Sequence, residues 1–107
     1  MAGKRYRVQW VSYARVALAN LTQFKVDSNS VFKRSKYVLS VEPENKSFGV
    51  IYHPGFEFNG YHWILMGNVI ILYQILEDEL EVNVDACFFA NTAFSHEIFW
   101  GIDPEDD

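Results

Sequence analysis

A short, uninterrupted apolar run limits what this chain can fold into more than any other feature of its sequence. Residues 69–73, Val-Ile-Ile-Leu-Tyr, follow one another without a polar side chain. A strand with one side in water alternates apolar and polar residues, whereas a continuous apolar run predicts a central strand that is covered on both faces. The expected fold is therefore a sheet with this segment inside it.

Turn signals on both sides of the run predict two more strands. A Gly-Asn pair at 67–68 joins residues 61–66 to residues 68–76, and both residues tolerate the positive φ of a tight hairpin. After an acidic turn at 77–79, apolar and charged or polar residues alternate through 80–86, which is the period of a strand with one buried face.

The first half of the chain predicts one strand and two helices. Residues 5–11 alternate as a strand does, and Ser12 is then placed to cap a helix that runs to about Phe24. Capping side chains at 27–30 open a second helix, and Pro43 marks its end because proline disfavours the helical conformation in the residue before it.

The order β-α-α-β-β-β predicts an α+β fold with a four-stranded, mainly antiparallel sheet and two N-terminal helices. Residues 44–60 have no clear period and are expected to form a loop with one short strand. With 107 residues, the chain is expected to form a single domain over 1–107, with a short acidic C-terminal tail at 101–107.

Charge divides the chain in two. All nine Lys and Arg residues lie at or before Lys46 with only three carboxylates, so that part carries +6, while the eleven later carboxylates give the rest −11. A phosphate-binding surface needs cations, so any nucleic-acid contact has to run largely through the first half. The alternative is that basic helices rest on an acidic sheet, where the asymmetry holds the chain together or keeps it soluble.

Several classes of protein are excluded by what the sequence lacks. Cys87 is the only cysteine, which excludes an internal disulfide or a multi-cysteine zinc site and fits a reducing compartment. The first residues are charged and lack the apolar stretch of a secretory signal, and no apolar run approaches the ~18 residues of a membrane span. We expect a cytoplasmic protein with no cofactor, no metal and no membrane partner.

Four short segments, in this order, carry a resemblance to a known family: Tyr-Arg-Val-Gln-Trp at 6–10, Leu-Ser-Val-Glu-Pro at 39–43, Ile-Leu-Tyr-Gln-Ile at 71–75 and Leu-Glu-Val-Asn-Val at 80–84. Together they resemble the RelE/ParE superfamily of bacterial type II toxins, over roughly residues 5 to 89. The resemblance implies a toxin that binds a cognate antitoxin. One branch of that superfamily cleaves mRNA on the ribosome, and another poisons DNA gyrase.

The chain departs from the mRNA-cleaving branch at its catalytic cations. That branch uses Lys and Arg to stabilise the phosphate charge that develops when the ribose 2′-hydroxyl attacks. The family's usual strand arginine falls at about Ile70, and a second frequent arginine falls at about Met66. Two readings stay open: an endoribonuclease toxin that uses histidine and tyrosine instead, or a non-catalytic, protein-binding member of the same fold.

The candidate catalytic residues are His62, Tyr61 and His53. Histidine can act as general acid or base near neutral pH, and tyrosine can orient a ribose or stack on a base. The structural alternative places His62 outward on a strand, His53 in a loop and His96 in a short terminal helix. Three separated histidines do not form a metal-binding motif.

Two surface features are candidates for partner binding. Lys33, Arg34 and Lys36, joined by Arg15 and Lys25, could contact a phosphate backbone, such as that of mRNA or the ribosome, or an acidic segment of the antitoxin. A solvated helix face is the alternative. Near the C-terminus a set of apolar residues is expected to pack on the body of the domain: Phe94, Ile98, Phe99 and Trp100.

Overall fold

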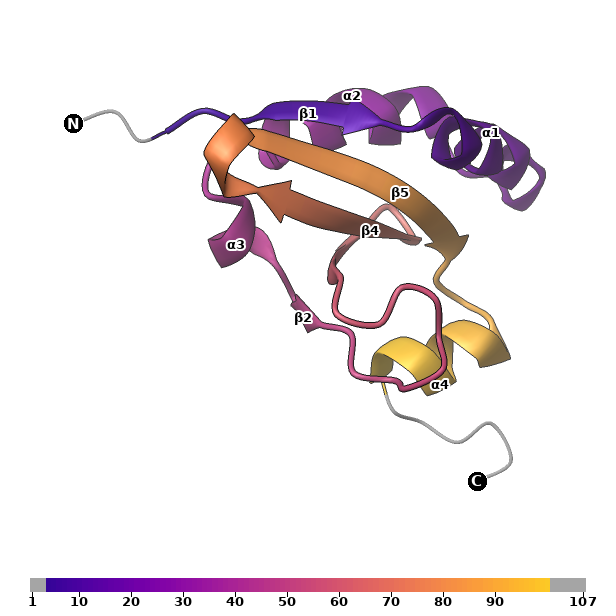
Figure 1. Ribbon diagram of the computed structural model, residues 1–107. Helices are drawn as coiled ribbons and strands as arrows, with labels where there is room; N and C mark the ends of the chain where they lie inside the picture. Colours follow the sequence, from indigo (N-terminus) through magenta and orange to yellow (C-terminus); the bar gives the residue numbers. More distant parts are fainter. Residues whose placement is uncertain (1–3, 101–107) are drawn as a thin grey trace.

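A computed structural model describes residues 4–100, in which a five-stranded sheet runs through the middle of the molecule (Figure 1). The strands lie in the order β1-β5-β4-β3-β2, with β1 parallel to β5 and the other neighbours antiparallel. The prediction of four strands was therefore wrong in number, because the short strand expected within 44–60 joins the sheet. The strands are β1 Arg7–Trp10, β2 Gly49–Val50, β3 His62–Met66, β4 Val69–Leu76 and β5 Glu81–Phe89.

The apolar run occupies the centre of this sheet, as the sequence predicts. All five residues of 69–73 are fully buried in β4, between β5 and β3. The preceding hairpin turn has φ of +55° at Gly67 and +64° at Asn68. Glycine and asparagine tolerate this left-handed conformation better than other residues do, so the turn chemistry sets the register of the two strands.

Four helices surround the sheet: α1 Ser12–Asn20, α2 Ser28–Val38, α3 Pro43–Lys46 and α4 Ala93–Trp100. The expectation of two N-terminal helices holds for α1 and α2, and α4 is the short terminal helix. The helix α3 was not predicted. Its first residue, Pro43, suits a helix start because its fixed φ is helical and its missing N–H would be unpaired there anyway.

The helix boundaries were predicted with mixed success. Asp27 caps α2, where its side chain accepts a hydrogen bond from the backbone N–H of Ser30 at 3.1 Å. Ser12 does not cap α1, because Val11 takes the capping position and no side chain bonds the free amides. After Asn20 the chain tightens into one 3₁₀ turn, and α2 already ends at Val38 rather than next to Pro43.

Two separate cores lie on the two faces of the sheet. Figure 1 shows α1 and α2 on one side of the sheet, and α4 with the loop between β2 and β3 on the other. We call them the helix face and the loop face. The helix face is closed by α1 and α2. Its core includes strand residues and residues of the helices and the segment after them: Val8, Leu18, Val31, Leu39, Ile71, Tyr73, Val82 and Val84. The loop face is closed by residues 51–61 and α4 over Trp63, Ile70, Leu72, Ala86 and Ala90.

A β-bulge in β5 decides which residues reach each face. Leu72 lies opposite Ala86, but the next residue, Tyr73, lies opposite Val84, so Asp85 is the extra residue. The bulge changes the alternation of β5, and as a result Val84 and Cys87 both pack on the helix face. Asp85 is thereby left on the loop face, facing Tyr61.

No helix within residues 4–100 combines the length and the apolar character needed to cross a membrane. The acidic tail predicted at 101–107 lies outside the described residues. In the described part, the acidic turn at 77–79 forms a 3₁₀ turn between β4 and β5.

Candidate functional site

His62 lies at the start of β3, where its ring stacks on that of Tyr73 in the neighbouring strand, with centroids 5.6 Å apart. Its Nδ1 is 3.0 Å from the Oγ of Ser47. The Ser47 Oγ also lies 2.8 Å from the carbonyl of Gly49. When the hydroxyl donates to that carbonyl, Nδ1 of His62 is the donor to Ser47 and Nε2 is left as a hydrogen-bond acceptor.

A shallow cleft of about 290 Å³ lies beside this histidine. It is lined by His62, Tyr73 and the β4 residues that follow Tyr73, together with Gly60. The Tyr73 hydroxyl donates to the buried carbonyl of Pro43 at 2.7 Å, and burial raises the pKa of Tyr73 to about 12. Tyr73 is therefore a core ring with a satisfied hydroxyl, as expected from its place in the apolar run.

Tyr61 points to the opposite face of the sheet from His62. Its hydroxyl donates to Oδ2 of Asp85 at 2.7 Å, and its ring packs against Phe58 with centroids 5.2 Å apart. Burial and the hydrogen bond to Asp85 raise the pKa of Tyr61 to about 12. A phenol held neutral by a carboxylate is a poor general base near pH 7.

His53 lies in the loop of the loop face, with its ring edge near Phe56. Its backbone N–H donates to the side-chain oxygen of Asn59 at 2.7 Å, which shapes the loop. The three catalytic candidates are therefore not brought together, because the sheet separates His62 from Tyr61 and neither bonds to His53. The sequence missed Ser47 and Asp85, whose roles depend on contacts between distant segments.

The position that matches the family's strand arginine is closed to solvent. Ile70 is fully buried in the loop-face core, and Met66 is buried in the helix-face core. Residues 47–100 contain no Lys or Arg, so neither the loop nor α4 brings a cation to that face. Cys87 is buried too, and burial raises the pKa of its thiol to about 12, which leaves it unreactive near neutral pH.

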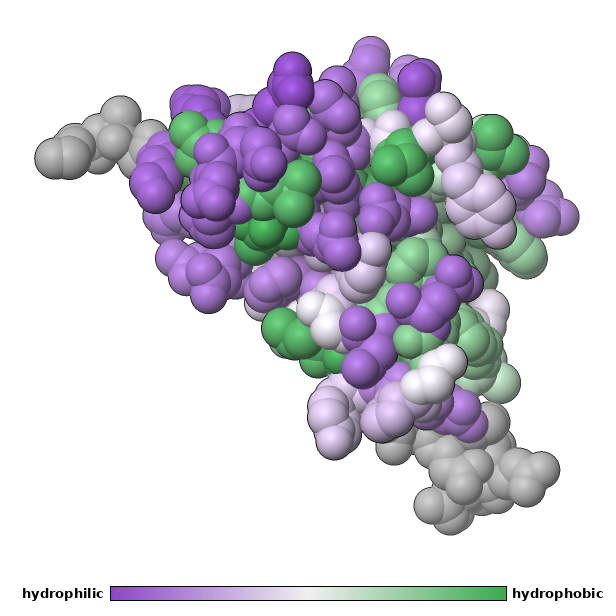
Figure 2. Space-filling view, in the orientation of Figure 1, coloured by the Kyte–Doolittle hydropathy of each residue, from purple (hydrophilic) through white to green (hydrophobic). Residues whose placement is uncertain are grey.

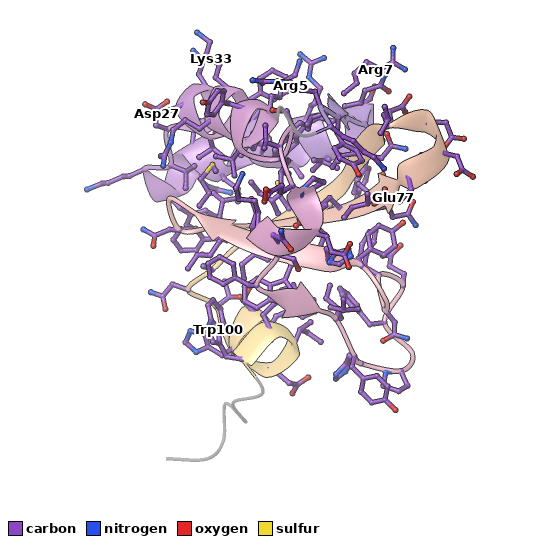
Figure 3. All side chains as sticks on the ribbon, turned by 90° about the vertical axis from the view of Figure 1, so that its left-hand side faces the viewer. Arg5, Arg7, Asp27, Lys33, Glu77 and Trp100 are labelled. Atoms are coloured by element: carbon purple, nitrogen blue, oxygen red, sulfur yellow. The ribbon has the colours of Figure 1, made fainter. Side chains whose placement is uncertain are left out.

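The cations gather on the other side of the molecule. Figure 3 shows Arg5, Arg7 and Lys33 at the end occupied by α1, α2 and β1, and Trp100 at the opposite end. Lys33, Arg34 and Lys36 are exposed on α2. Within residues 4–100 the one ion pair joins Arg7 to Glu81 at 2.6 Å, so the α2 cations have no carboxylate partner there.

An aromatic ring organises part of this basic surface. The guanidinium of Arg15 and the amine of Lys36 lie 5.2 Å and 5.3 Å from the ring centre of Phe32. Cations at these distances are attracted by the ring quadrupole, and they keep their charge available to a partner. Lys46 differs, because its amine donates to the carbonyls of Val38 and Val41 at the end of α2.

No metal site is evident in the described part of the chain, where no three His, Cys, Asp or Glu side chains converge. Of the four residues of α4 that the sequence predicted to pack on the body, Ile98 and Phe99 do so, whereas Phe94 and Trp100 stay 44% and 41% exposed. Phe99 contacts Trp63 and Phe88, and Phe94 contacts Phe56 and Phe88.

Comparison with solved structures gives an informative likeness. No family model and no curated protein sequence matches the chain. Among solved structures, a chain in the crystal structure of the toxin-antitoxin complex RelBE2 from Mycobacterium tuberculosis aligns with a TM-score of 0.61 and 22% sequence identity. The alignment covers 82% of this chain and 94% of that chain. The resemblance expected from the sequence is thus confirmed for the fold: this chain folds like a chain of a RelBE toxin-antitoxin complex.

Proposed function

We propose that this chain is a RelE-like toxin module that acts by binding proteins, among them a cognate antitoxin, and does not cleave RNA on its sheet. The fold it shares with a chain of a toxin-antitoxin complex supports the antitoxin partner. The observation that carries the proposal is the burial of Ile70, at about the place where the resemblance puts the usual strand arginine of the mRNA-cleaving branch. An apolar side chain beneath a packed layer cannot stabilise a phosphate.

The binding surface in this proposal is the basic face of α2, formed by Lys33, Arg34 and Lys36 with Arg15 beside Phe32. These cations are exposed, carry no carboxylate partner within residues 4–100, and are partly held in place by the ring. An acidic segment of the antitoxin would complement them, and the contact would weaken as salt is added.

A growth assay tests the class of function first. Expression of the chain alone should arrest growth, and co-expression of the product of an adjacent small gene should restore it. Normal growth at a verified level of folded protein would reject the toxin assignment.

A charge-matched pair of triple variants tests the binding surface. Replacing Lys33, Arg34 and Lys36 with Ala should weaken antitoxin binding and flatten its salt dependence. The control replaces Lys4, Arg5 and Arg7 with Ala, which removes the same charge outside α2 and outside the candidate patch. Equal losses in both variants would show that net charge, and not the α2 face, governs binding.

One observation favours ribosome-dependent RNA cleavage as the second candidate. In the tautomer that donates from Nδ1 to Ser47, Nε2 of His62 could take a proton from a ribose hydroxyl bound in the adjoining cleft. If the chain cleaves ribosome-bound mRNA, His62→Ala should abolish cleavage while the protein stays folded. Cleavage by the wild type that is unchanged in this variant would assign the chemistry elsewhere, and no cleavage by the wild type would leave the binding module as the function.

A further inference from the structure

The strand β5 extends beyond the strand that pairs with its outer edge. The four residues of β1 pair with residues 81–84, whereas β5 continues to Phe89 (Figure 1). The last backbone hydrogen bond between the two segments runs from the N–H of Val11 to the carbonyl of Val84, and the chain then turns into α1. Within residues 4–100, no strand pairs with the outer edge of residues 86–89.

The register of β5 against β4 shows which backbone groups point out of this edge. Ala90 donates its N–H to the carbonyl of Asn68, next to β4, at 2.8 Å. Bonding direction alternates along a strand, so every second residue bonds toward β4, while Cys87 and Phe89 direct their N–H and C=O groups outward. The outward carbonyl of Phe89 already accepts a hydrogen bond from Ser95 Oγ at 2.8 Å.

Cys87 therefore has backbone groups without a partner, although it is buried. It is 5% exposed, and within residues 4–100 no backbone or side-chain hydrogen bond reaches its outward N–H or C=O. Its thiol bonds to the carbonyl of Ala14 at 3.7 Å. Buried backbone groups in native proteins are nearly always paired, whether with protein, water or a ligand. The edge of β5 thus offers one donor and one acceptor to whatever occupies the adjoining space.

That space is a groove of about 340 Å³, which we call the β5 groove. All four residues 86–89 line it, and consecutive strand residues point to opposite faces, so the groove runs along the edge of the strand and not over one face. Tyr13 and Ala17 of α1 form one wall, and Glu57 with Phe58 forms the other. In Figure 2, hydrophobic residues reach the surface between α1 and α4, where Figure 1 places the end of β5.

The loop wall of the β5 groove is acidic. Burial, the hydrogen bond to Asp85 and the charges of Asp85 and Glu57 together raise the pKa of Tyr61, which places both carboxylates near one phenol. Residues 47–100 contain no Lys or Arg, and the one ion pair within residues 4–100 is that of Arg7 with Glu81. A cationic side chain from a partner would complement this wall.

We propose that the β5 groove binds a short extended segment of a partner protein, which pairs antiparallel with β5 beyond the end of β1 and carries Lys or Arg on both sides of an apolar residue. Strand addition of this kind takes its affinity from backbone bonds and its specificity from alternate side chains. In antiparallel pairing, one residue of the segment exchanges both bonds with Cys87.

The faces of the sheet assign the side chains of the segment. Cys87 points to the helix face, so the residue opposite it points there too and meets the apolar wall at Ala17 and Leu21. Its two neighbours in the segment point to the loop face, toward Glu57. The motif that fits is therefore basic–apolar–basic.

The chemistry of the groove selects a basic segment over other occupants. An acidic segment, which the basic face of α2 would attract, would be repelled by Glu57 and Asp85. The chain has a stretch of the fitting type in Arg-Tyr-Arg at 5–7, but Tyr6 and Arg7 are already bonded to Ser40 and Leu80, so a second copy does not offer it. The β5 groove is separate from the α2 face, and its assignment does not rest on the function proposed above.

Hydrogen exchange of the full chain tests the open edge first. In the free protein, the amide of Cys87 should exchange faster than that of Phe88, whose N–H bonds to β4. The probe is the acetylated and amidated heptapeptide Thr-Thr-Arg-Val-Lys-Thr-Thr. It should slow the exchange of the Cys87 amide and leave Phe88 unchanged. Equally slow exchange of both amides in the free protein would show that the edge is already covered and would overturn the proposal.

Methylated forms of the same peptide test the strand pairing. Methylation of the valine nitrogen removes the N–H that reaches the Cys87 carbonyl, and it should weaken binding about tenfold. The matched control carries the methyl group on the lysine backbone nitrogen, whose N–H points away from β5, and it should bind like the unmodified peptide. Equal affinities of the three peptides, or the opposite order, would overturn the proposal.

Charge variants test the acidic wall. Glu57→Gln should weaken binding of the heptapeptide about tenfold, whereas Glu79→Gln, an equally exposed change of the same charge in the turn after β4, should not. A peptide with Glu in place of its Arg and Lys should not bind. Equal weakening by both variants, binding of the acidic peptide, or no binding of the basic one at about 1 mM would overturn the proposal. These readouts depend neither on toxicity nor on an antitoxin.

Discussion

The two faces of the central sheet are closed in different ways. On the helix face, two helices lay aliphatic residues over the strands, and the buried Trp10 donates through Nε1 to Ser35 Oγ at 3.0 Å. On the loop face, a segment with little regular structure covers the sheet through rings, and Phe56 alone lies near the rings of His53, Phe58, Phe88 and Phe94.

The difference shows why this chain is rich in aromatic residues. An amphipathic helix supplies about three to four apolar side chains per two turns at fixed spacing, whereas a short irregular loop lacks that spacing and buries more area per residue when its side chains are aromatic. The aromatic share of 17% serves the loop face to a large extent. The same closure removes the open sheet surface on which phosphate chemistry would need cations.

The largest expected effect is the loss of unfolding free energy when either of two neighbouring core residues, one on each face, is replaced with alanine. Ile71→Ala on the helix face and Ile70→Ala on the loop face each remove a fully buried side chain, which typically costs about 2–5 kcal/mol of unfolding free energy. We expect the greater loss for Ile71→Ala, because rigid helices relax less into a cavity than a loop does. Denaturant unfolding measures both, and a greater loss for Ile70→Ala would reverse the comparison.

Alkaline pH should weaken both faces. The pKa of Cys87 is raised from 9.0 to about 12, and those of Tyr73 and Tyr61 from 10.0 to about 12. Between pH 9 and 12 these thiol and phenol groups lose their protons in the unfolded chain but keep them in the folded chain. The free energy of unfolding must therefore fall as pH rises from about 9 to 12. Denaturant midpoints across this range should decline, and less steeply in the Tyr61→Phe/Tyr73→Phe double variant. A constant midpoint would contradict the assigned burial.

The next effect compares the hydroxyl of the buried Tyr73 with that of the partly exposed Tyr61. Tyr73→Phe strands the buried carbonyl of Pro43 without a partner, at a cost of about 1–3 kcal/mol. Tyr61→Phe should cost less, about 1 kcal/mol, because the half-exposed Asp85 can be solvated by water instead. Thermal and denaturant unfolding give both values, and equal losses would mean that the two hydroxyls are equally enclosed.

The smallest effect concerns two ring pairs at the margins of the faces. Phe24 stacks on Phe89 beside the helix face at 4.7 Å, and Phe48 tilts against Trp63 beside the loop face. Phe24 and Phe48 are each about half exposed, so replacing either with alanine should cost only about 1 kcal/mol of unfolding free energy. The stacked Phe24 should show the greater loss in denaturant unfolding. A greater loss for Phe48→Ala would indicate that the edge of β2 is more tightly packed than its exposure implies.

Much of the fold could be predicted from local patterns. The run at 69–73, the Gly-Asn turn and the Asp27 cap act over a few residues, and each formed the expected structure. The bulge at Asp85 could not be predicted, because it depends on the register of β5 against β4. The helix α3 was missed because Pro43 was taken only as the end of the preceding helix and not as the start of a new one. The candidate site fared worse for the same reason: Tyr61 and His62 are adjacent in sequence, but the pleat sends them to opposite faces.

The sequence by itself determined the central strand, the hairpin and the confinement of every Lys and Arg to the first 46 residues, because periodicity, turn chemistry and composition are local or global properties of the chain. Only the tertiary structure decided that the face bearing Ile70 is buried, that His62 bonds to Ser47, and that Phe48, Val50 and Tyr52 are exposed. These features arise where segments far apart in sequence meet, and the register and side of that meeting are set by packing of the whole domain.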